Sequence, residues 1–265
     1  MTDQQIIEAF LAWASLDRRR SPHTIRRYEG VLASVGNAPS ATREEIEQWW
    51  ASRLHTSAAT RANELACLRT FYKWATRFDH RDDDPTRRLD APPIQNHVPR
   101  PISETNLRFL LGAPTEGMPD IRRAIYLGAY AGLRVSEAAA LHWSMADVET
   151  KRLYVRGKGA KERLVPVSDF LMEQLLPDTR KNVVTGTDHV YKPGDLQARI
   201  HRIMQSHGIN HTFHDFRKRA ATRAMAGGAS PQAVAQMFGW ASLQTVKRYA
   251  VVADSALDDI ASSIV

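Results

Sequence analysis

The sequence predicts a mainly α-helical protein of two domains, of which only the second carries a small antiparallel β-sheet. Apolar residues recur at helical spacing through most of the 265-residue chain, in segments that begin at Ser, Thr or Pro capping signals. Strict alternation of apolar and polar residues occurs only around residues 147–167. Between residues 81 and 101 the helical pattern gives way to Asp and Pro, which predicts a domain boundary.

Residues 1–80 are expected to form a helical domain of four amphipathic helices. The first spans residues 3–16 and carries its apolar side chains at helical spacing. Each of the other three begins with a capping signal, namely Ser21 with Pro22, Thr42 with Glu45, and Ser57. No strand pattern interrupts these segments, so the domain is predicted to be purely helical.

Residues 81–101 are expected to be an extended linker stiffened by proline, and residues 102–265 to form the second domain. After three helices that end near Trp143, a hairpin is predicted from strands 152–156 and 163–167, with a third short strand near 147–149. Helices are then expected over residues 168–176, 193–207, 214–227, 231–238 and 242–251, followed by a short amphipathic helix over 254–263.

The charge balance favours a polyanionic partner. The chain has 36 Lys and Arg against 29 Asp and Glu, a formal net charge of +7. Nucleic acid is the first candidate, because each neutralised phosphate releases condensed counterions. Several arginines cluster in the first domain, and phosphate contacts are expected at Arg18, Arg19, Arg20, Arg26, Arg27 and Arg61. A solvated surface would explain any single cluster equally well.

Other classes of protein find little support. Cys67 is the single cysteine, which excludes a disulfide within the chain. The N-terminus lacks the regions of a signal peptide and no apolar run reaches membrane-spanning length, so we expect a cytoplasmic protein without a membrane partner. A zinc site at His207, His211 and His214 is disfavoured, because no carboxylate or cysteine cluster lies at ligand spacing from them. Neither a metal nor a cofactor is expected.

One C-terminal stretch carries residues suited to phosphodiester chemistry. His214 and Arg217 are three residues apart, so a helix beginning near His214 places both on one face. A guanidinium binds phosphate oxygens, an imidazole moves a proton, and the hydroxyl of Tyr249 can act as a covalent nucleophile. Taken singly, each residue has an ordinary structural explanation. Their combination indicates an enzyme that attacks a phosphodiester.

Three other positions, two of them upstream of His214, complete this set. Arg134 begins a helix with apolar flanks, where a guanidinium is unfavourable unless it meets an anion or the nearby carboxylate of Glu137. Lys158 lies between two glycines of the predicted hairpin and can act as a general acid, although a solvated turn lysine fits as well. Trp240 is either a core residue or a donor of its indole N–H to a phosphate oxygen.

Five motifs occur in order. They are Gly-Leu-Arg-Val-Ser-Glu at 132–137, the lysine hairpin, His-Asp-Phe-Arg at 214–217, Phe-Gly-Trp at 238–240 and Arg-Tyr-Ala at 248–250. Together they resemble the tyrosine recombinase family, which includes the phage integrases and Xer-like recombinases. The resemblance extends over nearly the whole chain, from Ser-Pro-x-Thr-x-x-x-Tyr at 21–28. The departures are Phe216, where members often have Leu, and Trp240, where many have His.

The resemblance implies roles for individual residues. They are the two catalytic arginines Arg134 and Arg217, the general acid Lys158, the proton-accepting His214, the phosphate-binding Trp240, the nucleophile Tyr249 and the supporting acid Glu137. It also implies a core-type DNA-binding domain and an α+β catalytic domain that form a clamp on double-stranded DNA. A homotetramer on two DNA sites, with an accessory directionality factor as a further partner, is the expected assembly. Cleavage is expected to pass through a 3′-phosphotyrosyl intermediate.

Four functional interpretations remain in competition. The chain begins almost directly at the four-helix domain, so we expect no arm-binding domain, and integration or excision of a phage or mobile element is the first expectation. Xer-like resolution of chromosome or plasmid dimers is the alternative. A type IB topoisomerase would use the same residues. A non-catalytic DNA-binding regulator on the same fold is disfavoured by the complete set of candidate catalytic residues.

Overall fold

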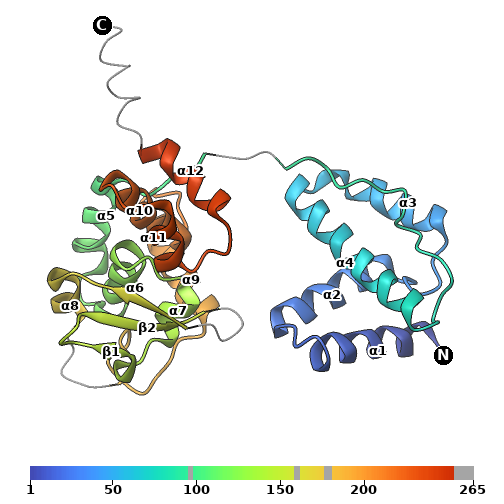
Figure 1. The fold of residues 1–265 in the computed structure, drawn as a ribbon, viewed down its shortest axis with the longest axis horizontal. Coiled ribbons are helices and arrows are strands. Elements are labelled where there is room, and N and C mark those ends of the chain that lie inside the picture. The colour runs from blue at the N-terminus through green and yellow to red at the C-terminus, as the bar shows by residue number, and fades with distance from the viewer. Residues whose placement is uncertain (95–97, 158–161, 176–180, 254–265) are drawn as a thin grey trace, which may run out of the picture. The chain divides into compact units, whose positions relative to one another are not determined.

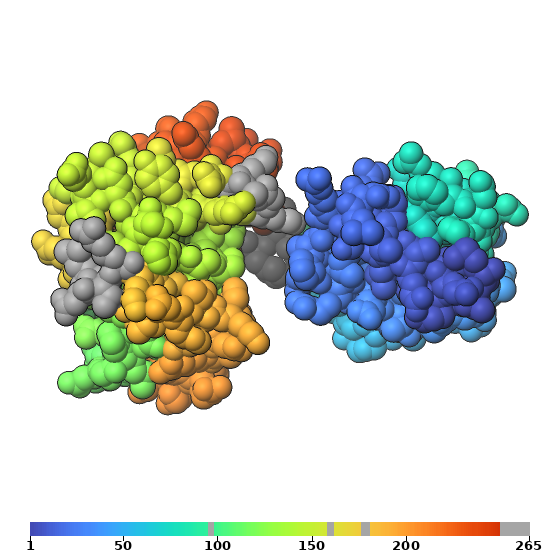
Figure 2. All heavy atoms as spheres, turned by 90° about the horizontal axis from the view of Figure 1, so that it is seen from below, coloured from blue at the N-terminus to red at the C-terminus, as the bar shows by residue number. Residues whose placement is uncertain are grey.

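In a computed structural model the chain divides into two compact units, Met1–Asn96 and His97–Val265 (Figure 1). The structure describes residues 1–94, 98–157, 162–175 and 181–253, without the side chains of residues 250–253. Figure 2 draws all heavy atoms, with the first unit in blue to cyan and the second in green to red. Lys158 and the helix predicted over residues 254–263 lie outside the described residues.

The N-terminal unit contains the four predicted helices, which confirms its helical class. They are α1 (Asp3–Leu16), α2 (Pro22–Val35), α3 (Arg43–Ser52) and α4 (Ala58–Arg77), with a 3₁₀ turn η1 (Arg53–His55) after α3. The capping signals act as the sequence indicates. Ser21 accepts a hydrogen bond from the backbone N–H of Thr24, and Thr42 and Glu45 form a capping box.

Aromatic side chains fill the core of this unit. The ring of Phe10 meets that of Phe71 edge to face, with centroids 5.2 Å apart, and it also contacts Tyr28 and Trp74. Such pairs contribute about 0.5–1.5 kcal/mol each beyond the burial of their area. The hydroxyl of buried Tyr72 donates to the carbonyl of Ala38 at 2.8 Å. The core therefore joins α1, α2 and α4 with the loop that precedes α3.

The segment 81–101, expected to be a linker, begins as part of this unit. The side chain of Asp84 accepts hydrogen bonds from the backbone N–H of Thr86 at 2.8 Å and from its hydroxyl at 2.6 Å. This turn returns the chain to the helices, where Thr86 and Leu89 are buried and Arg69 donates to the carbonyl of Leu89. The N-terminal core therefore extends to Leu89, inside the segment that was expected to be a linker.

Eight helices are described in the second unit, with short 3₁₀ turns between some of them. They are α5 (Glu104–Leu110), α6 (Pro119–Tyr130), α7 (Val135–Ala140), α8 (Asp169–Leu175), α9 (Pro193–Ser206), α10 (Phe213–Ala226), α11 (Pro231–Phe238) and α12 (Leu243–Ala253), with η2 (Ala113–Thr115) and η3 (Trp143–Met145). The structure thus confirms the predicted class, mainly helical with one small sheet.

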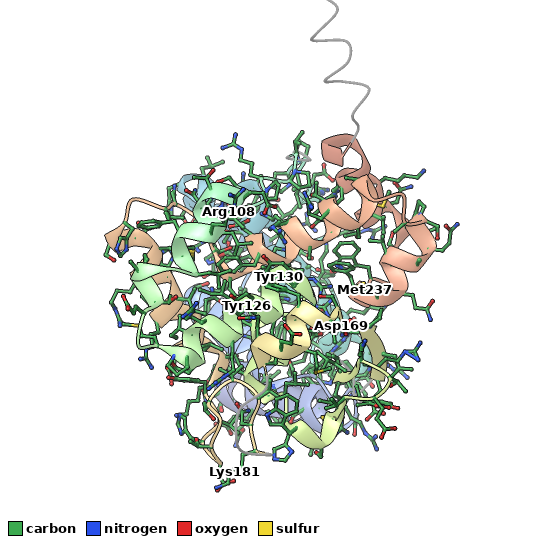
Figure 3. The ribbon with its side chains drawn as sticks, turned by 90° about the vertical axis from the view of Figure 1, so that its left-hand side faces the viewer. Arg108, Tyr126, Tyr130, Asp169, Lys181 and Met237 are labelled. Atoms are coloured by element: carbon green, nitrogen blue, oxygen red, sulfur yellow. The ribbon has the colours of Figure 1, made fainter. Side chains whose placement is uncertain are left out.

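Helices α6 and α10 pack closely against each other, and α10 carries His214 and Arg217. A Cβ on Gly128 of α6 would lie 3.0 Å from the ring of Phe213 and 3.1 Å from the Cβ of Phe216, both on α10. Tyr126 and Tyr130 lie one turn apart on α6, with ring centroids separated by 5.8 Å (Figure 3). The absence of a side chain at Gly128 therefore sets the separation of the two central helices.

Helix α7 ends at Ala140, earlier than the predicted end near Trp143. Leu141 is extended, with φ −68° and ψ 123°, and its carbonyl accepts from the backbone N–H of Val183 at 2.8 Å. The side chain of Asn182 donates to the carbonyl of Ala139 at 2.8 Å. A segment distant in the sequence thus satisfies the last carbonyls, and the helix does not need to continue.

The sheet is antiparallel, in the order β1 (Ala146–Asp147), β2 (Arg152–Arg156) and β3 (Glu162–Pro166). Leu153 stands opposite Val165, and both are buried, whereas the alternate positions of β2 are exposed. The hairpin was predicted with strands over 152–156 and 163–167. Its strands lie within one residue of those limits, and the hairpin approaches α11 through β3.

Candidate active site

One carboxylate, that of Glu137, binds the arginines of the site. It accepts hydrogen bonds from the backbone N–H of Arg134 at 2.8 Å and from Nη1 of Arg134 at 2.7 Å. Arg163 donates two parallel bonds to it, both of 2.8 Å. Nη1 of Arg217 lies 3.9 Å away. Three guanidinium groups therefore share one carboxylate, which leaves the cluster with an excess of positive charge.

The backbone around Gly132 brings these groups together. Gly132 has φ +64°, and a Cβ there would lie 2.3 Å from the ring of Phe238, so no other residue fits. The turn ends in Arg134, after which Glu137 occupies the third position of α7. A carboxylate in the first turn is favoured by the unpaired N–H groups and the dipole of the helix.

Glu137 is ionised at neutral pH. Burial by itself would raise the pKa of its carboxyl, but the hydrogen bonds from Arg163 and Arg134 outweigh it and lower the pKa to about 2. The carboxylate can then act as a fixed negative charge that orients the guanidinium groups. The carboxylate is buried and its oxygens already accept hydrogen bonds, which suits it to holding its neighbours in place.

Arg217 is completely buried, whereas His214, one turn earlier on α10, is exposed. Its amino groups donate to the carbonyls of Gly132 and Phe238, and the rings of Phe238 and Trp240 cover its guanidinium at 5.1 and 5.3 Å. Nε of Arg217 has no partner among the described residues. Burial, followed by repulsion from Arg134, lowers the pKa of Arg217 to about 9, so the group remains a cation at neutral pH.

Trp240 and Tyr249 form a parallel stack beside this guanidinium. Their ring centroids are 5.0 Å apart and their planes differ by 10°. Trp240 follows Gly239, whose left-handed conformation ends α11, and Tyr249 lies on α12 with only 5% of its surface exposed. Burial raises the pKa of the Tyr249 hydroxyl, and the charges of Arg217 and Arg248 offset this only in part. The phenol therefore needs a base before it can act as a nucleophile.

His214 lies in the first turn of α10 and reaches solvent. The protein nevertheless crowds its imidazole, and this loss of water lowers its pKa, assisted by the positive charges of Lys218 and Arg217. Asp215 acts in the opposite direction but is held by hydrogen bonds from Thr212 and Lys218. At neutral pH the imidazole is therefore uncharged and able to accept a proton.

A cavity of about 340 Å³ opens at the arginine cluster. Its lining includes Arg134, Gly157, Arg163 and Trp240. Gly157 is the last described residue before Lys158, so the hairpin borders the cavity, while the position of Lys158 itself is not described. Guanidinium groups and an indole N–H around one cavity suit a phosphate group.

Arg163 is the site residue that the sequence reasoning missed. Besides binding Glu137, its Nε donates to the carbonyl of Met237 at 2.8 Å, so it joins β3 to the end of α11. A signal was present in the sequence. Arg163 and Val165 are two residues apart in a strand, so both point to the same, inward face. An arginine on that face needs a partner.

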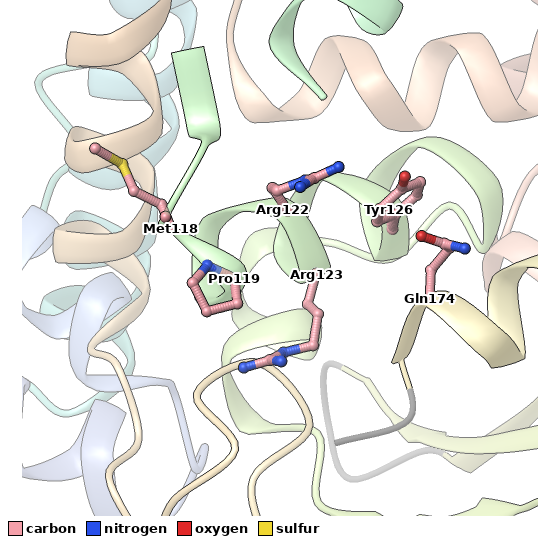
Figure 4. A pocket seen from close by; sticks show the side chains of 7 residues that line it. Met118, Pro119, Arg122, Arg123, Tyr126 and Gln174 are labelled. Atoms are coloured by element: carbon pink, nitrogen blue, oxygen red, sulfur yellow. The ribbon is translucent and has the colours of Figure 1, made fainter. Parts of the chain in front are cut away.

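A second cavity, of about 330 Å³, lies apart from these residues (Figure 4). Arg122, Arg123, Tyr126 and Gln174 line it, and none of the candidate catalytic residues does. Arg123 there donates to the carbonyl of Val184. Within the described part of the chain, no group of three or more His, Cys, Asp or Glu is arranged to hold a metal, and no helix is long and apolar enough to cross a membrane.

Comparison with known families identifies the chain. The profile of the phage integrase family matches residues 102–256, and that of the phage integrase N-terminal SAM-like domain matches residues 7–78. The chain belongs to the phage integrase family. This integrase-family protein is thus a tyrosine recombinase, an enzyme that breaks and rejoins DNA at specific sites, as the order of its motifs predicts.

Individual relatives are similar in sequence over almost the full chain. The integrase-family protein is 31% identical to the tyrosine recombinase XerD of Proteus mirabilis, covering 95% of this chain and 90% of the relative. It is 30% identical to XerC of Corynebacterium efficiens, covering 96% and 88%.

Solved structures share the fold. A lambda integrase dimer bound to a COC′ core site matches with a TM-score of 0.76 and 16% identity, over 94% of this chain and 77% of that one. The Tn1549 transposon integrase in complex with circular intermediate DNA matches with a TM-score of 0.70 and 17% identity, over 94% and 95%. The arrangement of helices around the small sheet is therefore that of an integrase.

Proposed function

We propose that the recombinase cleaves double-stranded DNA by attack of the Tyr249 hydroxyl on a phosphodiester held at the arginine cluster. The observation that carries this proposal is a continuous set of contacts: Arg134 and Arg217 lie at the Glu137 carboxylate, the ring of Trp240 covers Arg217, and Tyr249 stacks on Trp240. These residues come from α7, α10, the end of α11 and α12, and two of them, Arg134 and Trp240, line a cavity whose chemistry suits a phosphate.

Positive charge arranged in advance would stabilise the transition state. The non-bridging oxygens of the phosphate gain negative charge as the nucleophile approaches, and Arg134 with the indole N–H of Trp240 can bind them from the cavity. Arg217 is fully buried under the rings of Phe238 and Trp240, so its direct contact with the phosphate requires these covering groups to move. No metal is needed for this stabilisation.

Proton transfers complete each step. His214 accepts the proton of the Tyr249 hydroxyl, the new bond joins the tyrosine oxygen to phosphorus, and the bond to the 5′-oxygen breaks. Lys158 is assigned the transfer of a proton to that leaving oxygen, on the resemblance alone. Attack of a 5′-hydroxyl on the 3′-phosphotyrosyl bond then restores a phosphodiester and the free tyrosine, so rejoining needs no ATP.

The enzyme is proposed to act as a homotetramer on two DNA sites, in the cytoplasm of a bacterial or phage-infected cell. A lambda integrase tetramer bound to a Holliday junction has the same fold, with a TM-score of 0.74 and 17% identity. An accessory directionality factor remains part of the proposal because strand exchange by itself is reversible.

Two biological roles stand as candidates. Integration or excision of a phage or mobile element was the first expectation. The identities of about 30% with XerD and XerC favour the alternative, resolution of chromosome or plasmid dimers. Recombination between directly repeated sites on one plasmid, tested against recombination between two different attachment sites, distinguishes the roles.

The chemistry is tested with a nicked duplex that contains the recombination site. A nick next to the cleaved bond lets the short 5′ end diffuse away, which traps the covalent complex on a denaturing gel. We expect an adduct with the wild type and with the control Tyr154→Phe, an exposed tyrosine of β2, but none with Tyr249→Phe. An adduct that survives in Tyr249→Phe would overturn the assignment of the nucleophile.

A further inference from the structure

Helix α10 buries a second arginine besides Arg217, and the proposed cleavage chemistry does not use it. Arg219 has only 7% of its surface exposed. Burial of a guanidinium is unfavourable unless hydrogen bonds and a counterion compensate for the water that is lost. The partners of Arg219 therefore indicate what this residue does.

All three nitrogens of the Arg219 guanidinium have a partner. Nε and Nη2 donate to the two carboxylate oxygens of Glu104, at 2.8 and 2.9 Å. Nη1 donates to the carbonyl of Ala129 at 2.8 Å. The ring of Tyr130, labelled in Figure 3, lies against the guanidinium with its centroid 4.8 Å from Cζ. One side chain of α10 thus joins the start of α5 to the end of α6.

The end of α6 is important because the chain turns from it into Arg134. Ala129 lies in the last turn of α6, and Arg134 follows five residues later. Arg217 donates to the carbonyl of Gly132 within the same turn. Two arginines of α10, Arg217 and Arg219, therefore hold this short segment at carbonyls three residues apart.

Glu104 holds Arg219 from the segment with which the second unit begins. It is the first residue of α5, and hydrogen bonds from Arg219 lower the pKa of its carboxyl, so the group is ionised at neutral pH. Two residues earlier, the backbone N–H of buried Ile102 donates to the carbonyl of Asp215 at 3.4 Å. Both contacts fall within the first two turns of α10, which begin at His214 and its neighbours.

Stability alone does not account for an arginine at this position. An ion pair that buries a guanidinium is a weak source of stability, because desolvation offsets much of the attraction. Apolar contacts would fill the same space, but they have no directionality. Hydrogen bonds fix both distance and direction, and the planar fork of arginine holds a carboxylate in a single geometry. Arg219 therefore indicates a requirement for fixed geometry between α6 and α10.

We propose that Arg219 is a positioning residue for DNA cleavage, which holds the end of α6 against α10 so that Arg134 and Arg217 keep their relative positions. Glu104 acts in turn by holding Arg219. The inference rests on the proposed function, because cleavage by Tyr249 is the reaction whose rate reports on these positions. Arg219 is not among the residues that line the cavity at the arginine cluster, so its effect passes through its neighbours.

The test measures single-turnover adduct formation on the nicked duplex over a range of enzyme concentrations. Arg219→Gln leaves one amide where three nitrogens bound two partners. Arg199→Gln is the matched control, because Arg199 pairs at 3.1 Å with Asp120 in the first turn of α6, at the opposite end of the same helix. Melting curves define a temperature at which the variants are fully folded. If Arg219→Gln does not fold, Glu104→Gln, at a partly exposed position, replaces it.

We expect Arg219→Gln to lower the saturated rate of adduct formation by about 10- to 100-fold, since a misplacement of about 1 Å has effects up to this size. The enzyme concentration that gives half of this rate should remain close to that of the wild type, because Arg219 is assigned no contact with DNA. Arg199→Gln should keep the saturated rate of the wild type.

Three results would overturn the inference. They are an unchanged saturated rate in folded Arg219→Gln, an effect confined to the half-saturating concentration, and equal losses of rate in Arg219→Gln and Arg199→Gln. An adduct from the wild type together with any of these results contradicts this inference alone. No adduct from the wild type on its recombination site would contradict the proposed function, and the inference with it.

Discussion

Arg163 on β3 donates two parallel hydrogen bonds of 2.8 Å to the carboxylate of Glu137 on α7. Its third donor, Nε, binds the carbonyl of Met237 near the end of α11. One guanidinium thus connects the hairpin, the helix that follows Arg134 and the segment that leads to Trp240. The planar fork of arginine matches a carboxylate in a way that the single ammonium of lysine does not.

Replacement of this residue should separate catalysis from DNA binding. In Arg163→Lys, Glu137 keeps Arg134 but loses the paired bonds, and we expect the rate of adduct formation to fall by about 100-fold because small misplacements of catalytic groups have effects of this size. Affinity for duplex DNA should be nearly unchanged. Arg152→Lys, on the exposed face of β2, is the matched control. A rate equal to that of the wild type would show that Arg163 does not position the site.

The buried carboxylate of Glu137 should make stability depend on pH. Its pKa falls from 4.5 to about 2 on folding, so the unfolded chain binds the proton more readily between these values. The stabilisation is complete above about pH 4.5 and is lost as the pH falls toward 2. At about 1.4 kcal/mol per pKa unit, the shift corresponds to about 3 kcal/mol.

Denaturant titrations at several pH values measure this effect. Glu137→Gln should remove that part of the acid dependence and also destabilise the protein at neutral pH, by about 3–5 kcal/mol, because Arg163, whose side chain is only 10% exposed, loses its counterion. Glu173→Gln, at an exposed position of α8, should leave both quantities unchanged. Identical acid dependence in Glu137→Gln and the wild type would contradict the assignment.

The pH profile of cleavage should identify the base. Burial and neighbouring cations lower the pKa of His214 below its ordinary value of 6.5, so the neutral imidazole persists into mildly acidic solution. We expect the rate of single-turnover adduct formation to decline on acidification with a midpoint below pH 6.5. His214→Gln should slow the reaction and abolish that decline. A decline that persists unchanged in His214→Gln would assign the titration to another group.

A substitution at Trp240 can distinguish the contribution of ring stacking from that of its hydrogen-bonding N–H. Trp240→Phe keeps an aromatic ring over Tyr249 but removes the indole N–H, and we expect about a 100-fold slower cleavage, as for loss of one donor to a charged transition state. The adduct yield at long times should be retained. Trp50→Phe, in the other unit, controls for the general effect of removing an indole. Unaltered cleavage in Trp240→Phe would limit this residue to packing.

The turn at Gly132 should tolerate no side chain. Gly132→Ala introduces a Cβ 2.3 Å from the ring of Phe238 at a positive φ of 64°. We expect a loss of about 1–3 kcal/mol in the free energy of unfolding from backbone strain, with further loss from the displaced ring. Gly30→Ala, on α2 with nothing within 4 Å, is the control and should stabilise by about 0.5–1 kcal/mol. Similar melting temperatures for wild type and Gly132→Ala would contradict this account.

Much of the fold follows from local rules that the sequence displays directly. Ser21, Thr42 and Ser57 cap helices where the sequence places them, because a cap depends on groups only two or three residues away. The hairpin follows for the same reason, since alternation and turn residues are local signals. The early end of α7 was not predictable, because the groups that satisfy its carbonyls lie near Asn182.

By itself, the sequence determined the two-unit helical architecture, the family and the identities of the candidate catalytic residues. Only the tertiary structure decided how those residues are held: Arg163 joins Glu137 across 26 residues, and Arg217 reaches the carbonyl of Gly132 across 85. It also decided that Arg217 is buried and that Trp240 stacks on Tyr249. The physical reason is that capping and periodicity act over one or two turns, whereas burial and charge pairing depend on which distant segments the packed core brings together.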